Sequence, residues 1–134
     1  MQMQKGTLEK VIYPEISYIL TGIFFSVHND LGACCREKQY CDAIEEMLKS
    51  KGIKYRRELG NKDDELLKDN SNKVDFLIDG KIIIEVKAKR VIGRDEYQQT
   101  QRYLKNFNLK LGMIVNFHQK YLAPKRVLNS TAKE

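Results

Sequence analysis

The segment KVDFLIDGKIIIEVKAKR, residues 73–90, constrains the fold more than any other part of this chain. Two apolar runs, 74–78 and 81–88, flank an Asp79–Gly80 pair. Apolar runs on both sides of an Asp-Gly pair are a strong signal for a β-hairpin, because both residue types accept the backbone conformation of a tight turn. The segment therefore predicts two neighbouring antiparallel strands.

The second strand of this hairpin carries charge on one of its faces. Glu85 and Lys87 share a face because side chains alternate along a strand. A half-buried strand with a wet outer face explains this pattern without any function. A functional site needs a second acid close to Glu85, and Asp75 on the first strand is the candidate.

The length of the hairpin loop decides whether Asp75 and Glu85 meet. A two-residue turn would put Asp75 on the opposite face from Glu85. A three-residue loop over residues 78–80 would pair Leu77 with Lys81 and bring Asp75 to the face of Glu85. The sequence permits both loops. Only an odd-numbered loop or a bulge makes a site, and we expect it, with the glycine of the loop at positive φ.

Together the two acids and Lys87 would suit one kind of chemistry. Two carboxylates held close together repel each other, and a hard divalent cation relieves the repulsion. Mg²⁺ takes oxygen ligands, often one or two carboxylates with water and substrate phosphate. The lysine can orient a water or offset negative charge on a phosphate. The set suits metal-dependent phosphodiester hydrolysis, although an Asp followed by Glu-x-Lys also arises often by chance.

The rest of the chain predicts a single α/β domain over residues 1–134, with its core at about 12–128. Its order is α-α-β-β-β-α-β-(β), around a mixed sheet. Besides the hairpin, the expected elements are helices over 14–30, 36–50 and 95–106, strands over 53–59, 109–117 and 123–128, and a polar loop over 60–73 with a short strand at Leu66–Leu67.

Charge indicates the kind of partner. The chain has a formal net charge of +6 and a sequence pI of about 9.2. A basic protein favours a polyanionic partner, and nucleic acid is the first candidate. Three basic residues follow the proposed site directly, namely Lys89, Arg90 and Arg94. They suit contacts to a phosphate backbone, although an ordinary solvated face would look the same.

Other classes of protein fit less well. No apolar stretch approaches the ~20 residues of a membrane helix, so we expect no membrane association. The start, MQMQKGTLEK, has no signal-peptide core, which makes the cytoplasm the expected location. The three cysteines, Cys34, Cys35 and Cys41, have a spacing that fits no standard zinc site, and reduced thiols are expected.

Several separate segments, in the same order, resemble the PD-(D/E)XK nuclease superfamily and, within it, the small proteins called the GxxExxY family. They cover nearly the whole chain: YPEISY at 13–18, VHNDLG at 27–32, EKQY at 37–40, VDFLIDGKIIIEVKA at 74–88, QRYLK at 101–105 and LKLGMIVNF at 109–117. The resemblance implies a three-layer core, in which helices flank a mixed four-stranded sheet. It assigns catalytic roles to Asp75, Glu85, Lys87, Glu37 and Gln99, with Asp75, Glu85 and Glu37 toward the metal.

The motif that names the family departs from its pattern at one position. Its glycine would stand three residues before Glu37, where this chain has Cys34, so the turn into the second helix is expected to differ. Without the resemblance, Glu37 is an acid favoured by the helix dipole and Gln99 belongs to a polar helix face. Tyr40, the tyrosine of the motif, is either a core residue with a wet hydroxyl or a contact to the nucleic acid.

The leading hypothesis is therefore a nuclease that uses Mg²⁺, with Mn²⁺ as a substitute, and cuts DNA or RNA, with DNA the first candidate. A rival hypothesis is a nucleic-acid-binding or regulatory protein that keeps the fold without turnover. A third is a protein–protein module, in which the apolar helix over 14–30 forms a homodimer.

Overall fold

The structure is a computed structural model, and it describes residues 12–59 and 74–132. The predicted strand at Leu66–Leu67 lies outside these residues. The helices are α2 (Pro14–Leu31), α3 (Glu37–Ser50) and α4 (Arg94–Phe107), and the strands are β1 (Tyr55–Leu59), β2 (Val74–Ile78), β3 (Ile82–Lys87), β4 (Leu111–Asn116) and β5 (Lys125–Leu128). The predicted order is confirmed, with element ends shifted by one or two residues in most cases.

Proline and glycine set the ends of the first two helices. Pro14 opens α2, where its missing N–H leaves no helical hydrogen bond unmade. Gly32 ends α2 at φ 77°, and Gly52 follows α3 at φ 69°. Both φ values are positive, in a region that favours glycine. No helix in the two described stretches is long and apolar enough to cross a membrane.

The strands form one mixed sheet in the order β1-β2-β3-β4-β5. Neighbouring strands are antiparallel except β3 and β4, which are parallel and joined through α4. The resemblance implied four strands, and Lys125–Leu128 adds the fifth at the edge. Because β3 and β4 run the same way, Lys87 and Asn116 end side by side at one edge of the sheet.

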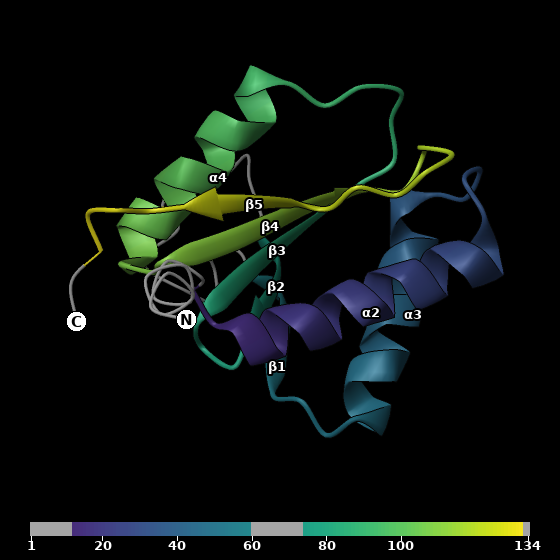
Figure 1. Cartoon of the computed structure of the whole chain (residues 1–134), viewed down its shortest axis with the longest axis horizontal. Coiled ribbons are helices and arrows are strands. Elements are labelled where there is room, and N and C mark those ends of the chain that lie inside the picture. Colours follow the sequence, from purple (N-terminus) through teal and green to yellow (C-terminus); the bar gives the residue numbers. More distant parts are fainter. Residues whose placement is uncertain (1–11, 60–73, 133–134) are drawn as a thin grey trace, which may run out of the picture.

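Helices cover both faces of the sheet, as Figure 1 shows. Helices α2 and α3 lie on one face, over a core of residues that includes Phe76, Ile84 and Val86. Helix α4 lies on the other face, over a smaller core that includes Ile83 and Ile114. The predicted three-layer arrangement is therefore confirmed, and the alternation of Ile83, Ile84 and Val86 between the layers shows the two faces of β3.

The β2–β3 hairpin combines a two-residue turn with a bulge. Asp79 and Gly80 have φ of 53° and 66°, as a type I′ turn requires, and Lys81 N donates to Ile78 O at 2.8 Å. Ile78 nevertheless pairs with Ile82, so Lys81 is an extra residue that forms a bulge between the turn and β3. Residues 79–81 thus lie between the paired strand ends, so the expected odd number of connecting residues is confirmed. The expected positive φ of Gly80 is confirmed as well. The expected pairing of Leu77 with Lys81 is wrong, because the bulge follows the turn and Leu77 pairs with Ile83.

Candidate active site

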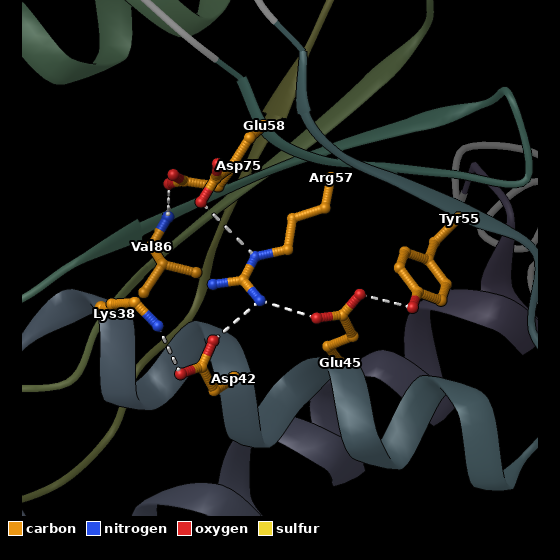
Figure 2. Close-up of polar contacts among 8 residues, drawn as sticks. All are labelled: Lys38, Asp42, Glu45, Tyr55, Arg57, Glu58, Asp75 and Val86. Carbon is orange, nitrogen blue, oxygen red and sulfur yellow. Dashed lines mark hydrogen bonds and ion pairs between the residues drawn. The ribbon is translucent and has the colours of Figure 1, made fainter.

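Asp75 lies where β2 and β3 begin to separate. The regular pairing ends at Phe76 with Ile84, and one further step would put Asp75 opposite Glu85. Instead of continuing the ladder, the Val86 N–H donates to Asp75 Oδ2 at 2.7 Å, as Figure 2 shows. The Asp75 side chain thus takes over a backbone hydrogen bond of β3, and this bond holds its carboxylate beside that of Glu85.

Glu85 is a buried carboxylate, only 4% exposed. Its strand face is that of Ile83, which packs against α4. Within the described residues its Oε2 atom has no hydrogen-bond partner. Burial raises the pKa of Glu85 well above its ordinary value, the Asp75 charge and a hydrogen bond to Asp75 raise it further, and the Lys87 charge opposes the shift.

The carboxyl group of Asp75 is shifted in the same direction. Burial raises its pKa to about 6, while the hydrogen bond from Val86 and the charge of Lys87 work against the rise. The negative charge of Glu37 adds to the rise. Ionisation of both acids would place two negative charges close together in a region of low dielectric. A bound cation would offset these charges, so the pair is suited to hold one.

Lys87 ends β3 next to this pair. It is half-buried, and its charge acts on both Asp75 and Glu85. Its carbonyl accepts a 2.9 Å hydrogen bond from Phe117 N, which fixes the backbone at the end of the strand against β4. The structure thus brings together the three residues predicted from the hairpin.

Glu37 approaches the pair from the other layer, as the first residue of α3. It is exposed, and its charge reaches both Asp75 and Glu85. The turn before it contains Cys34 in place of the motif glycine. Cys34 is not among the described non-glycine residues with positive φ, so cysteine follows this turn without the strain that a glycine conformation would impose.

The donor set fits a divalent metal that binds few protein ligands. Two adjacent carboxylates, one with a buried oxygen that lacks a partner, are what Mg²⁺ uses when water and phosphate complete its coordination. Among residues 12–59 and 74–132, however, no group of three or more His, Cys, Asp or Glu is arranged to hold a metal ion. In this structure Glu37 therefore acts on the pair through its charge and does not complete a three-carboxylate set.

Comparison with known protein families agrees with this geometry. The family model described as the PD-(D/E)XK nuclease superfamily matches residues 14–127. The chain belongs to the PD-(D/E)XK nuclease superfamily. No curated protein and no solved structure gives a significant match. Membership supports a nuclease-like function that acts on nucleic acid, and nucleases of this superfamily typically use divalent metals.

An arginine that the sequence argument missed joins two layers of this superfamily domain. Arg57 on β1 pairs with Phe76, next to Asp75, and its guanidinium lies 5.7 Å from the Phe76 ring centre. Its Nη1 donates to Glu45 Oε1 at 2.7 Å and lies 2.8 Å from Asp42 Oδ1, as Figure 2 shows. Both acids belong to α3, so Arg57 ties the helix that begins at Glu37 to the sheet.

The same cluster includes two more residues of β1. Tyr55 Oη donates to Glu45 Oε2 at 2.6 Å, and this bond raises the pKa of Tyr55 to about 12. Glu58 Oε2 lies 3.8 Å from Arg57 Nε, and Glu58 has φ 56°. The sequence contains one indication of this cluster. Asp42 and Glu45 lie three residues apart on one face of α3, and the next strand carries the basic residue Arg57.

Tyr40 belongs to the core. It is 0% exposed, stacks on Phe117 with ring centres 4.3 Å apart, and donates its hydroxyl to Gly32 O at 2.6 Å. Its oxygen also accepts from Cys35 N at 3.0 Å. The predicted contact to nucleic acid is therefore wrong, because a side chain with no exposed surface cannot touch a ligand. Tyr40 instead shapes the turn that leads to Glu37.

The predicted basic contacts differ from one another. Lys89 is already paired, with its Nζ 2.7 Å from Glu96 Oε2, and this partner raises the pKa of Lys89. Arg90 and Arg94 are exposed, and neither forms an ion pair within the described residues. Gln99 is half-buried on α4, and no hydrogen bond joins it to another residue in the described stretches.

Proposed function

We propose that this protein is a metal-dependent nuclease, whose site consists of Asp75, Glu85 and Lys87. The observation that carries the proposal is the buried carboxylate pair. Glu85 Oε2 has no partner in the described residues, and the pKa of both acids is raised. A buried carboxylate oxygen without a hydrogen-bond partner costs folding free energy, and buried acids with raised pKa concentrate at functional sites. Superfamily membership supports the same interpretation.

Each residue of the site would have a distinct role. Asp75 and Glu85 would hold Mg²⁺, or Mn²⁺ in its place, and this ion would supply the Lewis acidity that hydrolysis of a phosphodiester requires. Lys87, at the end of β3, would orient the attacking water and offset negative charge that develops on the phosphate. Glu37 would support the metal from α3 through water, and Gln99 would position the site from α4.

Nucleic acid is the proposed substrate, and DNA is the first candidate. The net charge of +6 favours a polyanion, and Arg90 and Arg94 offer exposed guanidinium groups just after the strand that ends at Lys87. We further propose that the chain is a member of the GxxExxY family. Its Glu37 and Tyr40 hold the last two motif positions, and Cys34 replaces the glycine without strain.

Metal binding and cleavage test the proposal in one preparation. Mn²⁺ titration by water-proton relaxation should detect a site that Asp75→Asn and Glu85→Gln each weaken strongly. Wild-type protein with Mg²⁺ or Mn²⁺ should cut at least one of single-stranded DNA, duplex DNA, single-stranded RNA and duplex RNA. Glu46→Gln is the matched control, since Glu46 is an exposed acid on α3. Unchanged Mn²⁺ affinity in both site variants would overturn the metal site, and binding of nucleic acid without cleavage would favour the non-catalytic rival.

A further inference from the structure

Three loops meet at the edge of the sheet where β3 and β4 end. They are residues 32–36 before α3, residues 88–93 before α4, and residues 117–124 before β5. Figure 1 shows all three at the same end of the molecule, beside the start of α3. Because Lys87 ends β3, this loop edge borders the candidate active site.

Three polar side chains, Asn116, His118 and His28, restrain these loops. Asn116 Nδ2 donates to Lys89 O at 2.8 Å, and its Oδ1 accepts from Lys89 N at 3.1 Å. His118 Nε2 lies 2.6 Å from Cys35 O, and His28 Nε2 lies 2.8 Å from Gln119 O. Bonds of this kind between backbone and side chain restrain the loops, so the loop edge presents a preformed surface.

Large apolar side chains stand out from this restrained surface. Tyr121 is 78% exposed and Val91 is 72% exposed. The loop is nevertheless anchored on both sides of Tyr121, because the Gln119 carbonyl is bonded to His28 and Leu122 is only 7% exposed. Lys120 Nζ lies 5.4 Å from the Tyr121 ring centre. The ring of Tyr121 is thus held in solvent by a loop whose neighbouring residues are anchored, with a cation beside it.

The charge of the loop edge is predominantly positive. Residues 32–36, 88–93 and 117–124 carry four basic side chains (Arg36, Lys89, Arg90 and Lys120) and no acidic one. Of these four, Lys89 is paired with Glu96 at the start of α4. A basic surface that also exposes an aromatic ring complements a ligand with both phosphates and accessible flat bases.

We propose that the loop edge binds a single-stranded segment of nucleic acid, with one unpaired base stacked on Tyr121 and the backbone phosphates near Arg90 and Lys120. The inference rests on the proposed function and specifies its substrate. Stacking on an aromatic side chain needs an exposed base face, which a duplex covers, whereas every unpaired base offers one. The strand would then pass from the loop edge to Asp75, Glu85 and Lys87.

Binding without metal tests this proposal separately from cleavage. Fluorescence anisotropy, with EDTA and low salt, compares a labelled 12-nucleotide single strand of DNA, the RNA strand of the same sequence, and the 12-base-pair DNA duplex. Single strands should bind more tightly than the duplex. Tyr121→Ala should weaken single-strand binding by roughly 5- to 100-fold, the loss expected for one stacked base. Tyr121→Phe should restore it, because the phenyl ring still stacks.

Tyr18 provides a matched control. It is 81% exposed on α2, away from the loop edge, so Tyr18→Ala should leave binding unchanged. The chain contains no tryptophan, which allows a direct spectroscopic test. Tyr121→Trp should lose fluorescence when the single strand is added, whereas Tyr18→Trp should not.

Some outcomes would overturn the inference and others would overturn only the proposed function. Equal affinity for single strand and duplex, or Tyr121→Ala that binds as wild type does, would overturn the inference even if the protein cleaves duplex DNA. Tight binding to another protein or to lipid vesicles with no affinity for oligonucleotides would overturn it too. A Tyr121-dependent affinity for single strands in a protein that cleaves nothing would support the inference and refute the nuclease.

Discussion

Val86 donates its backbone N–H to Asp75 Oδ2 at 2.7 Å, across the point where β2 and β3 separate. A backbone donor that would otherwise belong to the ladder thereby fixes an acidic side chain. The carboxylate of Glu85 is buried beside Asp75, and the two negative charges repel each other. The hydrogen bond from Val86 holds Asp75 in place against this repulsion. This hydrogen bond helps the fold to keep the two acids side by side.

Neutralising Glu85 should stabilise the metal-free protein. Glu85→Gln keeps the shape of the side chain and removes a buried acid whose ionisation is opposed by burial and by Asp75. We expect the free energy of unfolding at pH 7 in EDTA to rise by about 1–3 kcal/mol, measured by urea denaturation. Glu46→Gln, at an exposed position, should stay within about 0.5 kcal/mol of wild type. A loss of stability in Glu85→Gln would mean that the charged form is favoured in the fold.

The same acids should make metal-free stability depend on pH. Asp75 has a folded pKa of about 6, above its unfolded value, so between these values the folded state binds more protons than the unfolded state. Stability from this group is complete below pH ~4 and is lost as pH rises through 6. Asp75→Asn should therefore gain stability relative to wild type between pH 4 and pH 7, on the order of 1–3 kcal/mol. A difference that stays constant over this range would contradict the raised pKa.

Arg57 should stabilise the contact between α3 and the sheet. Arg57→Met keeps most of the stem but removes the cation that contacts Glu45 and one of the two that contact Asp42, the other being Lys38. The side chain of Arg57 is only 16% exposed. We expect a loss of about 2–4 kcal/mol in the free energy of unfolding. Arg56→Met removes an exposed neighbour and should change it by less than about 0.5 kcal/mol. Equal effects of the two substitutions would show that the Arg57 cluster contributes nothing specific.

The hairpin turn should require glycine at position 80. Gly80 has φ 66°, and a Cβ there would meet no atom within 4 Å, so any cost of Gly80→Ala comes from the backbone alone. Thermal unfolding should show a loss of about 1 kcal/mol. Gly22→Ala, also in open space but within α2, should instead stabilise by about 0.5–1 kcal/mol. Stabilisation by both substitutions would argue against the left-handed turn.

Local patterns were sufficient to predict most of the fold. The period of the apolar residues predicted α2, α3 and α4, and the Asp79–Gly80 pair predicted the hairpin. The pairing register could not be predicted, because the same sequence is compatible with a two-residue loop and with a three-residue loop. The structure resolves this by placing Lys81 in a bulge after a two-residue turn, which gives Asp75 and Glu85 the same parity.

Contacts between distant segments were beyond the sequence argument. Arg57 and Glu45 are 12 residues apart and on different elements, and His118 and Cys35 are 83 apart. Their pairing depends on how α3 lies over the sheet, which no local pattern specifies. For the same reason the sequence does not decide whether Tyr40 is a core residue or a ligand contact, since its burial depends on the position of Phe117 in the β4–β5 connection.

The rate of cleavage by Lys87→Met tests the central claim most directly. The variant keeps the stem of the side chain and deletes the charge beside Asp75 and Glu85, so folding, Mn²⁺ binding and affinity for nucleic acid in EDTA should survive. Lys81→Met, in the bulge just before β3 and half-exposed, is the matched control and should cleave as wild type does. With the best-cleaved substrate and saturating Mg²⁺ or Mn²⁺, we predict that Lys87→Met cleaves about 10²–10⁴-fold more slowly than wild type. Cleavage by Lys87→Met at the wild-type rate would contradict the account.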